Sequence, residues 1–246
     1  MSQKKPLIIL TGPTAVGKTA LSIEIAKAVN GEMISADSMQ VYRMLDIGTA
    51  KIKPEEMEGI RHYLIDVLEP TEDFNVFRFQ QMAKAALEEI YAKGKIPIVV
   101  GGTGFYIQAL LYDITFEETE ESPYRKKLEH YAKINGAHAL HEQLKDIDPV
   151  SYQEIHENNV KRVIRALEFY HDTGYPISTH NALEREKESP YNFAYFVLND
   201  DRQKLYNRIE YRIDQMLEDG LVKEVQSALA YGCTKEMVSM QGLGYK

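Results

Sequence analysis

A glycine-rich stretch near the N-terminus, TGPTAVGKTA at 11–20, has the spacing of a phosphate-binding P-loop. Its glycines let backbone N–H groups close around phosphate oxygens, and the helix that begins there adds positive potential. Lys18 supplies a mobile cation, and Thr19 can ligate a phosphate-bound Mg²⁺. The alternative is a glycine turn that merely joins a strand to a helix. The predicted diphosphate- or nucleotide-binding residues are Gly12, Pro13, Thr14, Ala15, Val16, Gly17, Lys18 and Thr19.

Asp37, in MISADSMQVY, is the carboxylate best placed for chemistry. It lies just past an apolar strand, where an open α/β sheet faces the same crevice as the P-loop. Its alternative role is a helix or turn cap. The strand IPIVVGGTG ends in a hydroxyl, Thr103, and bare backbone, where a P-loop ATPase carries a metal-binding acid. Asp66, in YLIDVLEP, is either such an acid or an ordinary strand-end residue.

Apolar runs rich in Ile and Val alternate with segments of helical period, which predicts a parallel sheet covered by helices on both faces. We therefore expect an α/β, P-loop NTPase-like fold with an inserted all-helical subdomain. The core comprises 1–114 and 191–246, and the insertion covers 115–190. Expected strands are 7–10, 33–35, 63–68, 96–100 and 193–198, and expected helices include 19–29, 77–92, 105–111 and 202–220.

The 246 residues carry 29 Lys plus Arg against 37 Asp plus Glu, which disfavours a non-specific nucleic-acid binder. Basic residues can still gather on one face, and three groups do so in the sequence. They are Arg125-Lys126-Lys127, Lys161-Arg162 with Arg165, and Arg208 with Arg212, the last pair sharing a helix face. Each group by itself is more typical of a solvated helix face, and Arg208 with Arg212 could instead form an ion-pair ladder with Glu210 and Asp214.

No apolar run reaches the length of a bilayer span, so we expect a cytoplasmic protein. The single cysteine, Cys233, excludes an internal disulfide and is expected in a surface turn without a catalytic role. The final residues, SMQGLGYK, contain no helix stop signal, so we expect a truncated C-terminus.

Seven blocks follow one another along nearly the whole chain: GPTAVGKT, SADSMQVY, DIGTAK, HYLIDVLEP, GGTGFYIQALL, KRVIRALE and RIEYRIDQMLEDGLVKEV. Taken together, they resemble the tRNA dimethylallyltransferase family. The resemblance implies transfer of a dimethylallyl group from dimethylallyl diphosphate to N6 of the adenosine directly 3′ to the anticodon, assisted by Mg²⁺. Because diphosphate is then the leaving group, no phosphoryl-transfer apparatus is required.

The resemblance also assigns roles. Asp37, Thr103 and Arg212 would be catalytic: Asp37 accepts the N6 proton, Thr103 lies near the amine, and Arg212 binds diphosphate. The residues that would meet tRNA are Asp37, Ser38, Met39, Gln40, Thr103, Lys161, Arg162, Val163, Ile164 and Arg165. The partners would be the tRNA anticodon stem-loop and the prenyl donor, with no membrane, and we expect a monomer.

The sequence departs from the family at Met44, where members commonly have glycine, and at Ile52-Lys53, which separate GTAK from Pro54. Members also continue past GYK with a helical stretch that contacts tRNA. Two other functions fit a P-loop with a helical insertion. A small-molecule kinase would bind ATP and transfer a phosphoryl group, although no arginine-rich lid is seen. An RNA-binding module that uses the P-loop as a switch would leave Asp37 without a role.

Overall fold

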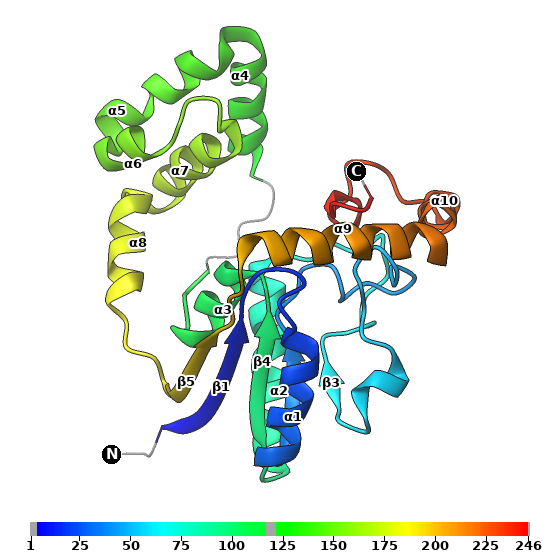
Figure 1. Ribbon diagram of the computed structural model, residues 1–246. Helices are drawn as coiled ribbons and strands as arrows, with labels where there is room; N and C mark the ends of the chain where they lie inside the picture. Colours follow the sequence, from blue (N-terminus) through cyan, green and yellow to red (C-terminus); the bar gives the residue numbers. More distant parts are fainter. Residues whose placement is uncertain (1–3, 117–121, 246) are drawn as a thin grey trace. The chain divides into compact units, whose positions relative to one another are not determined.

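The computed structural model describes residues 4–116 and 122–245, and the chain forms two compact units (Figure 1). One unit comprises Met1–Asp113 and Ser189–Lys246, and the other comprises Ile114–Glu188. The second unit therefore interrupts the first along the sequence. The second unit begins one residue before, and ends two residues before, the predicted insertion at 115–190. Residues 117–121 of that predicted insertion lie outside the described residues.

The first unit contains a five-stranded parallel sheet in the order β3-β2-β4-β1-β5. Ile9 of β1 pairs with Val99 on one side and Tyr195 on the other. Since all strands run the same way, their carboxyl ends meet at one edge, and the predicted parallel sheet flanked by helices is confirmed. The strands are β1 (Lys5–Thr11), β2 (Gly31–Ser35), β3 (His62–Tyr63), β4 (Ile96–Gly101) and β5 (Tyr191–Val197).

Successive side chains of β1 face opposite sides of the sheet. Leu7 and Ile9 belong to the large core on the side of α2 and α3, whereas Ile8 packs in the smaller core beneath α1. Figure 1 shows α9 lying across the carboxyl ends of the strands, which puts it over the P-loop. The helices of this unit are α1 (Lys18–Val29), η1 (Pro54–Met57), α2 (Val76–Ala92), α3 (Gly104–Leu111), α9 (Arg202–Asp219), α10 (Leu221–Tyr231) and η2 (Val238–Gln241).

The third strand is much shorter than the predicted strand at 63–68. It ends at Tyr63 because Leu64 (φ 63°) and Asp66 (φ 54°) adopt left-handed backbone conformations that cannot continue a strand. Pairing resumes only as an isolated bridge between Tyr42 and Leu68. The apolar pattern of this segment reflects burial in a loop rather than an extended strand.

The second unit is all-helical and has a core of its own. Leu128, Leu140 and Leu144 pack with apolar residues of α7. The buried Asp148 carboxylate accepts hydrogen bonds from the hydroxyls of Ser151 (2.7 Å) and Ser178 (2.6 Å), which joins α6 to α8. No helix in the described ranges is long and apolar enough to cross a membrane. The helices are α4 (Pro123–Glu142), α5 (Leu144–Ile147), α6 (Pro149–Glu154), α7 (Val160–Thr173) and α8 (Ile177–Glu186).

Cys233 is not in a surface turn, as the sequence suggested, but in the core of the first unit, with 5% of its surface exposed. Gly232 ends α10 with a left-handed backbone (φ 112°), and this turn directs the next residue inward. Burial raises the pKa of the thiol, which keeps it protonated and unreactive.

Candidate active site

The P-loop joins β1 to α1 along a backbone path that requires glycine. Gly12 has φ +150°, and a Cβ there would lie 2.5 Å from the backbone oxygen of Leu198. Gly17, at φ +95°, immediately precedes the first residue of α1. The loop therefore brings the N-terminus of α1, with its positive potential, to the carboxyl edge of the sheet.

Lys18 lies folded over this loop. Its Nζ donates hydrogen bonds to the backbone oxygens of Gly12 (2.8 Å) and Pro13 (2.7 Å). Burial lowers the pKa of Lys18, Arg212 lowers it further, and Asp37 opposes both effects. Phosphate oxygens are stronger partners for an ammonium than neutral carbonyls are, so this side chain is suited to exchange loop carbonyls for a bound anion.

Two arginines of α9 lie near the P-loop. The guanidinium of Arg208 donates to the backbone oxygen of Ala15 (3.3 Å) and forms a salt bridge with Asp200 (2.9 Å), so α9 is attached to the P-loop. Arg212 follows one turn later and is half-buried. Its pKa is lowered by burial against the opposing effect of Asp37. Since no described carboxylate forms a salt bridge with Arg212, the alternative of an ion-pair ladder along α9 does not apply to it.

Asp37 lies two residues past β2. Its contacts are compatible with both roles that the sequence allowed, a turn cap and a carboxylate that takes part in chemistry. Its Oδ1 accepts the backbone N–H groups of Met39 (2.8 Å) and Gln40 (3.2 Å), which makes it a turn cap. Its Oδ2 accepts no hydrogen bond from any described residue. One oxygen thus fixes the orientation of the carboxylate, and the other remains able to take a proton.

Thr103 is placed beside Asp37 by a close contact between neighbouring strand ends. A Cβ at Gly101 would lie 2.1 Å from the backbone oxygen of Ala36, so only glycine permits the approach. The backbone N–H of Thr103 then donates to that same oxygen (3.2 Å). The Thr103 hydroxyl makes no hydrogen bond within the described part of the chain. Thr103 is therefore hydrogen-bonded to the residue directly before Asp37, and the two residues to which the resemblance gave neighbouring roles lie close together.

The three residues after Asp37 differ in accessibility. Met39 packs against the core of the first unit. The Gln40 side-chain amide donates to the backbone oxygens of Thr49 and Ala50, each at 3.3 Å. Ser38, half-exposed, has no such engagement among the described residues. Of this block, only Ser38 presents an unengaged side chain to a ligand.

The Asp66 carboxylate forms a salt bridge with a lysine, which does not fit the alternative role as a metal-site acid. Its Oδ1 accepts a hydrogen bond from Nζ of Lys51, whose side chain is only 5% exposed. The same ammonium contacts Asp46 and the backbone oxygen of Tyr42. Of the two roles that the sequence left open for Asp66, the structure favours the structural one.

The residues of α7 that were predicted to bind tRNA lie partly on the surface and partly in the core of the helical unit. Lys161 and Arg162 are exposed. Val163 and Ile164 are buried, at 0% and 3% exposure, in the core of the helical unit, which corrects the expectation that their side chains meet tRNA. Arg165 is half-exposed and forms a salt bridge with the buried Glu168 (3.7 Å). The helical period of α7 dictates this alternation.

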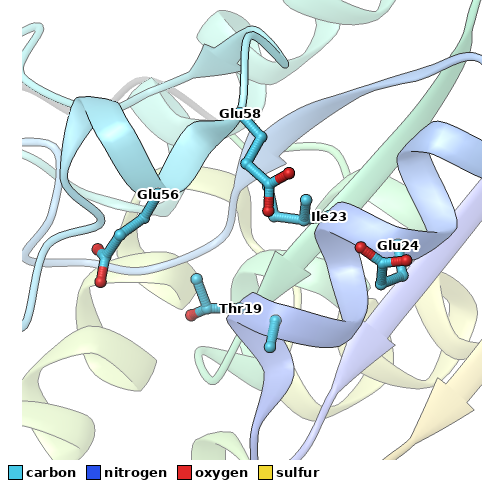
Figure 2. A pocket seen from close by; sticks show the side chains of 6 residues that line it. Thr19, Ile23, Glu24, Glu56 and Glu58 are labelled. Carbon is cyan, nitrogen blue, oxygen red and sulfur yellow. The ribbon is translucent and has the colours of Figure 1, made fainter.

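An open cavity of about 420 Å³ adjoins Thr19 at the start of α1 (Figure 2). The Thr19 side chain points toward η1, which carries Glu56, and Glu24 and Glu58 line the same space. No group of three or more His, Cys, Asp or Glu side chains suited to a metal occurs among residues 4–116 and 122–245. The Thr19 hydroxyl, together with water and ligand phosphates, is a donor set that Mg²⁺ accepts.

A strand, P-loop and helix, with two half-buried cations beside one carboxylate, are typical of an α/β protein that binds a phosphorylated ligand. Residues 40–246 match the sequence family described as IPP transferase. The tRNA dimethylallyltransferase of Lachnoclostridium phytofermentans is 62% identical over 98% of this chain and 78% of its own length. The chain belongs to this family of transferases.

Solved structures agree with this assignment. The full-length tRNA isopentenylpyrophosphate transferase of Bacillus halodurans is 43% identical, with a TM-score of 0.69 over 99% of this chain and 75% of its own. A eukaryotic dimethylallyltransferase, described as acting on tRNA, is 31% identical, with a TM-score of 0.80 over 95% of this chain and 58% of its own. The shared fold therefore extends over both units of the chain.

Lys18→Ala tests the phosphate site directly. Loss of this cation should weaken binding of inorganic diphosphate by at least about 10-fold, because a charge-assisted contact to phosphate is removed. Isothermal titration calorimetry measures the dissociation constant. Lys27→Ala, which removes the same charge from the exposed far end of α1, is the matched control and should leave the constant unchanged. Undiminished affinity in Lys18→Ala would contradict the assignment of the P-loop.

Proposed function

We propose that this chain transfers a dimethylallyl group from dimethylallyl diphosphate to N6 of the adenosine directly 3′ to the anticodon of tRNA, acting as a monomer. The observation that carries the proposal is the position of Asp37, whose Oδ2 is unengaged among the described residues, within electrostatic range of Lys18 and Arg212. Cations beside the P-loop suit a diphosphate, and a carboxylate next to them suits a proton acceptor.

Stabilisation of the leaving group is the main electrostatic task. As the bond between the allylic carbon and the diphosphate oxygen breaks, its electron pair leaves on the diphosphate and positive charge develops on the prenyl carbon. Lys18, Arg212 and the N-terminus of α1 provide fixed positive potential where the anion forms. Both cations are already partly desolvated, so little reorganisation is needed during the reaction.

Asp37 acts on the nucleophile. A new bond forms between N6 of adenine and the prenyl carbon, and the proton that N6 loses passes to Oδ2 of Asp37. Oδ1 stays bonded to the backbone N–H groups of Met39 and Gln40, which keeps the acceptor oxygen in place. The backbone N–H of Thr103 bonds to the residue before Asp37, and the Thr103 hydroxyl is available to hold the amine or a diphosphate oxygen. Ser38 would contact the extruded base.

The nucleic-acid contacts fall to the helical unit. Lys161 and Arg162, exposed at the start of α7, would contact the tRNA backbone, and Arg165 would join them from its partly exposed position. The target base must leave the anticodon-loop stack, which costs a few kcal/mol and is least unfavourable in a loop. Mg²⁺, held by Thr19 and the donor phosphates, would neutralise part of the charge on the departing diphosphate.

Asp37→Asn is the sharpest variant for the mechanism. Asparagine keeps an Oδ1 that can cap the turn but cannot accept the N6 proton, so the single-turnover rate of prenyl transfer should fall about 10²- to 10⁴-fold. The tRNA dissociation constant should change by less than about threefold. Asp214→Asn on the exposed part of α9 is the control. A single-turnover rate equal to wild type would remove Asp37 from the mechanism.

Lys161→Ala combined with Arg162→Ala tests the tRNA surface. Loss of two phosphate contacts should weaken tRNA binding roughly uniformly across sequences and reduce the slope of log K against log salt by about 1 to 2. Filter binding over a range of salt concentrations measures both effects. Lys133→Ala with Lys145→Ala removes the same charge from two exposed lysines of the same unit. An effect of equal size in this control would show a general charge effect rather than a defined tRNA contact on α7.

A further inference from the structure

Glu224 on α10 binds three consecutive backbone N–H groups of the loop that follows the Asp37 block. Its Oε2 accepts the N–H groups of Asp46 and Ile47, each at 2.8 Å, and its Oε1 accepts that of Gly48 at 3.0 Å. Successive N–H groups that converge on one anion form a nest, and each such hydrogen bond is charge-assisted. One side chain therefore holds this segment in place, although 176 to 178 residues separate the partners.

The clamp is completed by Tyr245, whose hydroxyl donates to Oε1 of Glu224 at 2.6 Å. A Cβ at Gly48 would lie 2.7 Å from the Tyr245 ring, so glycine is what allows the ring to close against the loop. Glu224 is half-buried. Its two oxygens accept four hydrogen bonds, which leaves little freedom for the carboxylate to move.

The other side of the loop is bonded to the Asp37 turn. Gln40 donates from its side-chain amide to the backbone oxygens of Thr49 and Ala50, and its own backbone N–H donates to Oδ1 of Asp37. A continuous series of hydrogen bonds thus runs from Glu224 through the loop and Gln40 to Asp37. Gln40 and Thr19, at the start of α1, also line a common small cavity.

We infer that Glu224 is a positioning residue for prenyl transfer: it fixes the loop at 46–50 and, through Gln40, the turn that orients the Asp37 carboxylate. This inference rests on the proposed function. Glu224 itself touches neither the P-loop nor any group proposed to react. Its effect is therefore on the rate of the chemical step and not on the binding of diphosphate.

The test compares Glu224→Ala, Glu224→Gln and the exposed neighbour Lys223→Ala as control. Misplacement of a catalytic group by a fraction of an ångström should lower the single-turnover rate in Glu224→Ala about 10- to 100-fold, with Glu224→Gln intermediate. The dissociation constant for inorganic diphosphate should stay within about twofold of wild type. A rate in Glu224→Ala equal to that of Lys223→Ala, or an equal loss of diphosphate affinity, would overturn the inference.

A double-mutant cycle with Gln40→Ala tests the route. If Glu224 acts through Gln40, the double variant should lose less activity than the product of the two single losses, and multiplicative losses would overturn this route.

Hydrogen exchange provides a readout without activity: amides at 45–51 and at 38–41 should both exchange faster in Glu224→Ala, and unchanged exchange at 38–41 would refute the link. An inactive wild-type protein would reject the proposed function, whereas the exchange result would still decide whether Glu224 orders the turn.

Discussion

Two backbone contacts at the carboxyl edge of the sheet determine where the P-loop, Asp37 and Thr103 lie. At one, Gly101 meets the backbone oxygen of Ala36, and at the other Gly12 meets that of Leu198. A side chain at either glycine would place its Cβ 2.1 or 2.5 Å from a carbonyl oxygen, a distance at which the backbone has to move. Parallel strands alone bring their ends to a common edge, and these contacts then hold the segments that carry the P-loop, Asp37 and Thr103 close to one another.

Positive charge gathers beside the P-loop before any ligand binds. Lys18 and Arg212 both have pKa values lowered by burial, so each retains a charge that its surroundings solvate poorly. Asp37 offsets this cost only in part. A diphosphate would supply the missing counter-charge, and the free energy already spent on desolvating the cations would then favour the anion as it forms. The arrangement suits stabilisation of a leaving group more than attack on a phosphorus atom.

Local patterns in the sequence predicted the elements that depend on local rules. The strand, glycine loop and helix at 5–29, the parallel sheet and the helix ending at Gly220 all follow from apolar period and capping. The strand expected at 63–68 failed because left-handed residues break it, and apolar content does not report backbone handedness. Met44 illustrates the same limit: it adopts φ 66°, a conformation that the family's usual glycine takes without strain.

The site was predictable where residues follow strand ends, and not where distant segments meet. Asp37 and Thr103 were selected as candidates because both follow strands of one sheet, and the structure places both at its carboxyl edge. Glu224 carries no such signal, since its partners are backbone N–H groups of another segment. Val163 and Ile164 were included with their basic neighbours although the period of α7 turns them to the core. Cys233 was expected in a surface turn, yet the turn at Gly232 leads it into the core.

The most direct test of the central claim is nucleoside mass analysis of unmodified tRNA incubated with the protein, Mg²⁺ and either dimethylallyl diphosphate or ATP. The account predicts a prenyl mass increase on adenosine with dimethylallyl diphosphate and none with ATP. No adduct with the prenyl donor, together with consumption of ATP on a small-molecule acceptor, would leave the P-loop as a phosphate site and contradict the role assigned to Asp37.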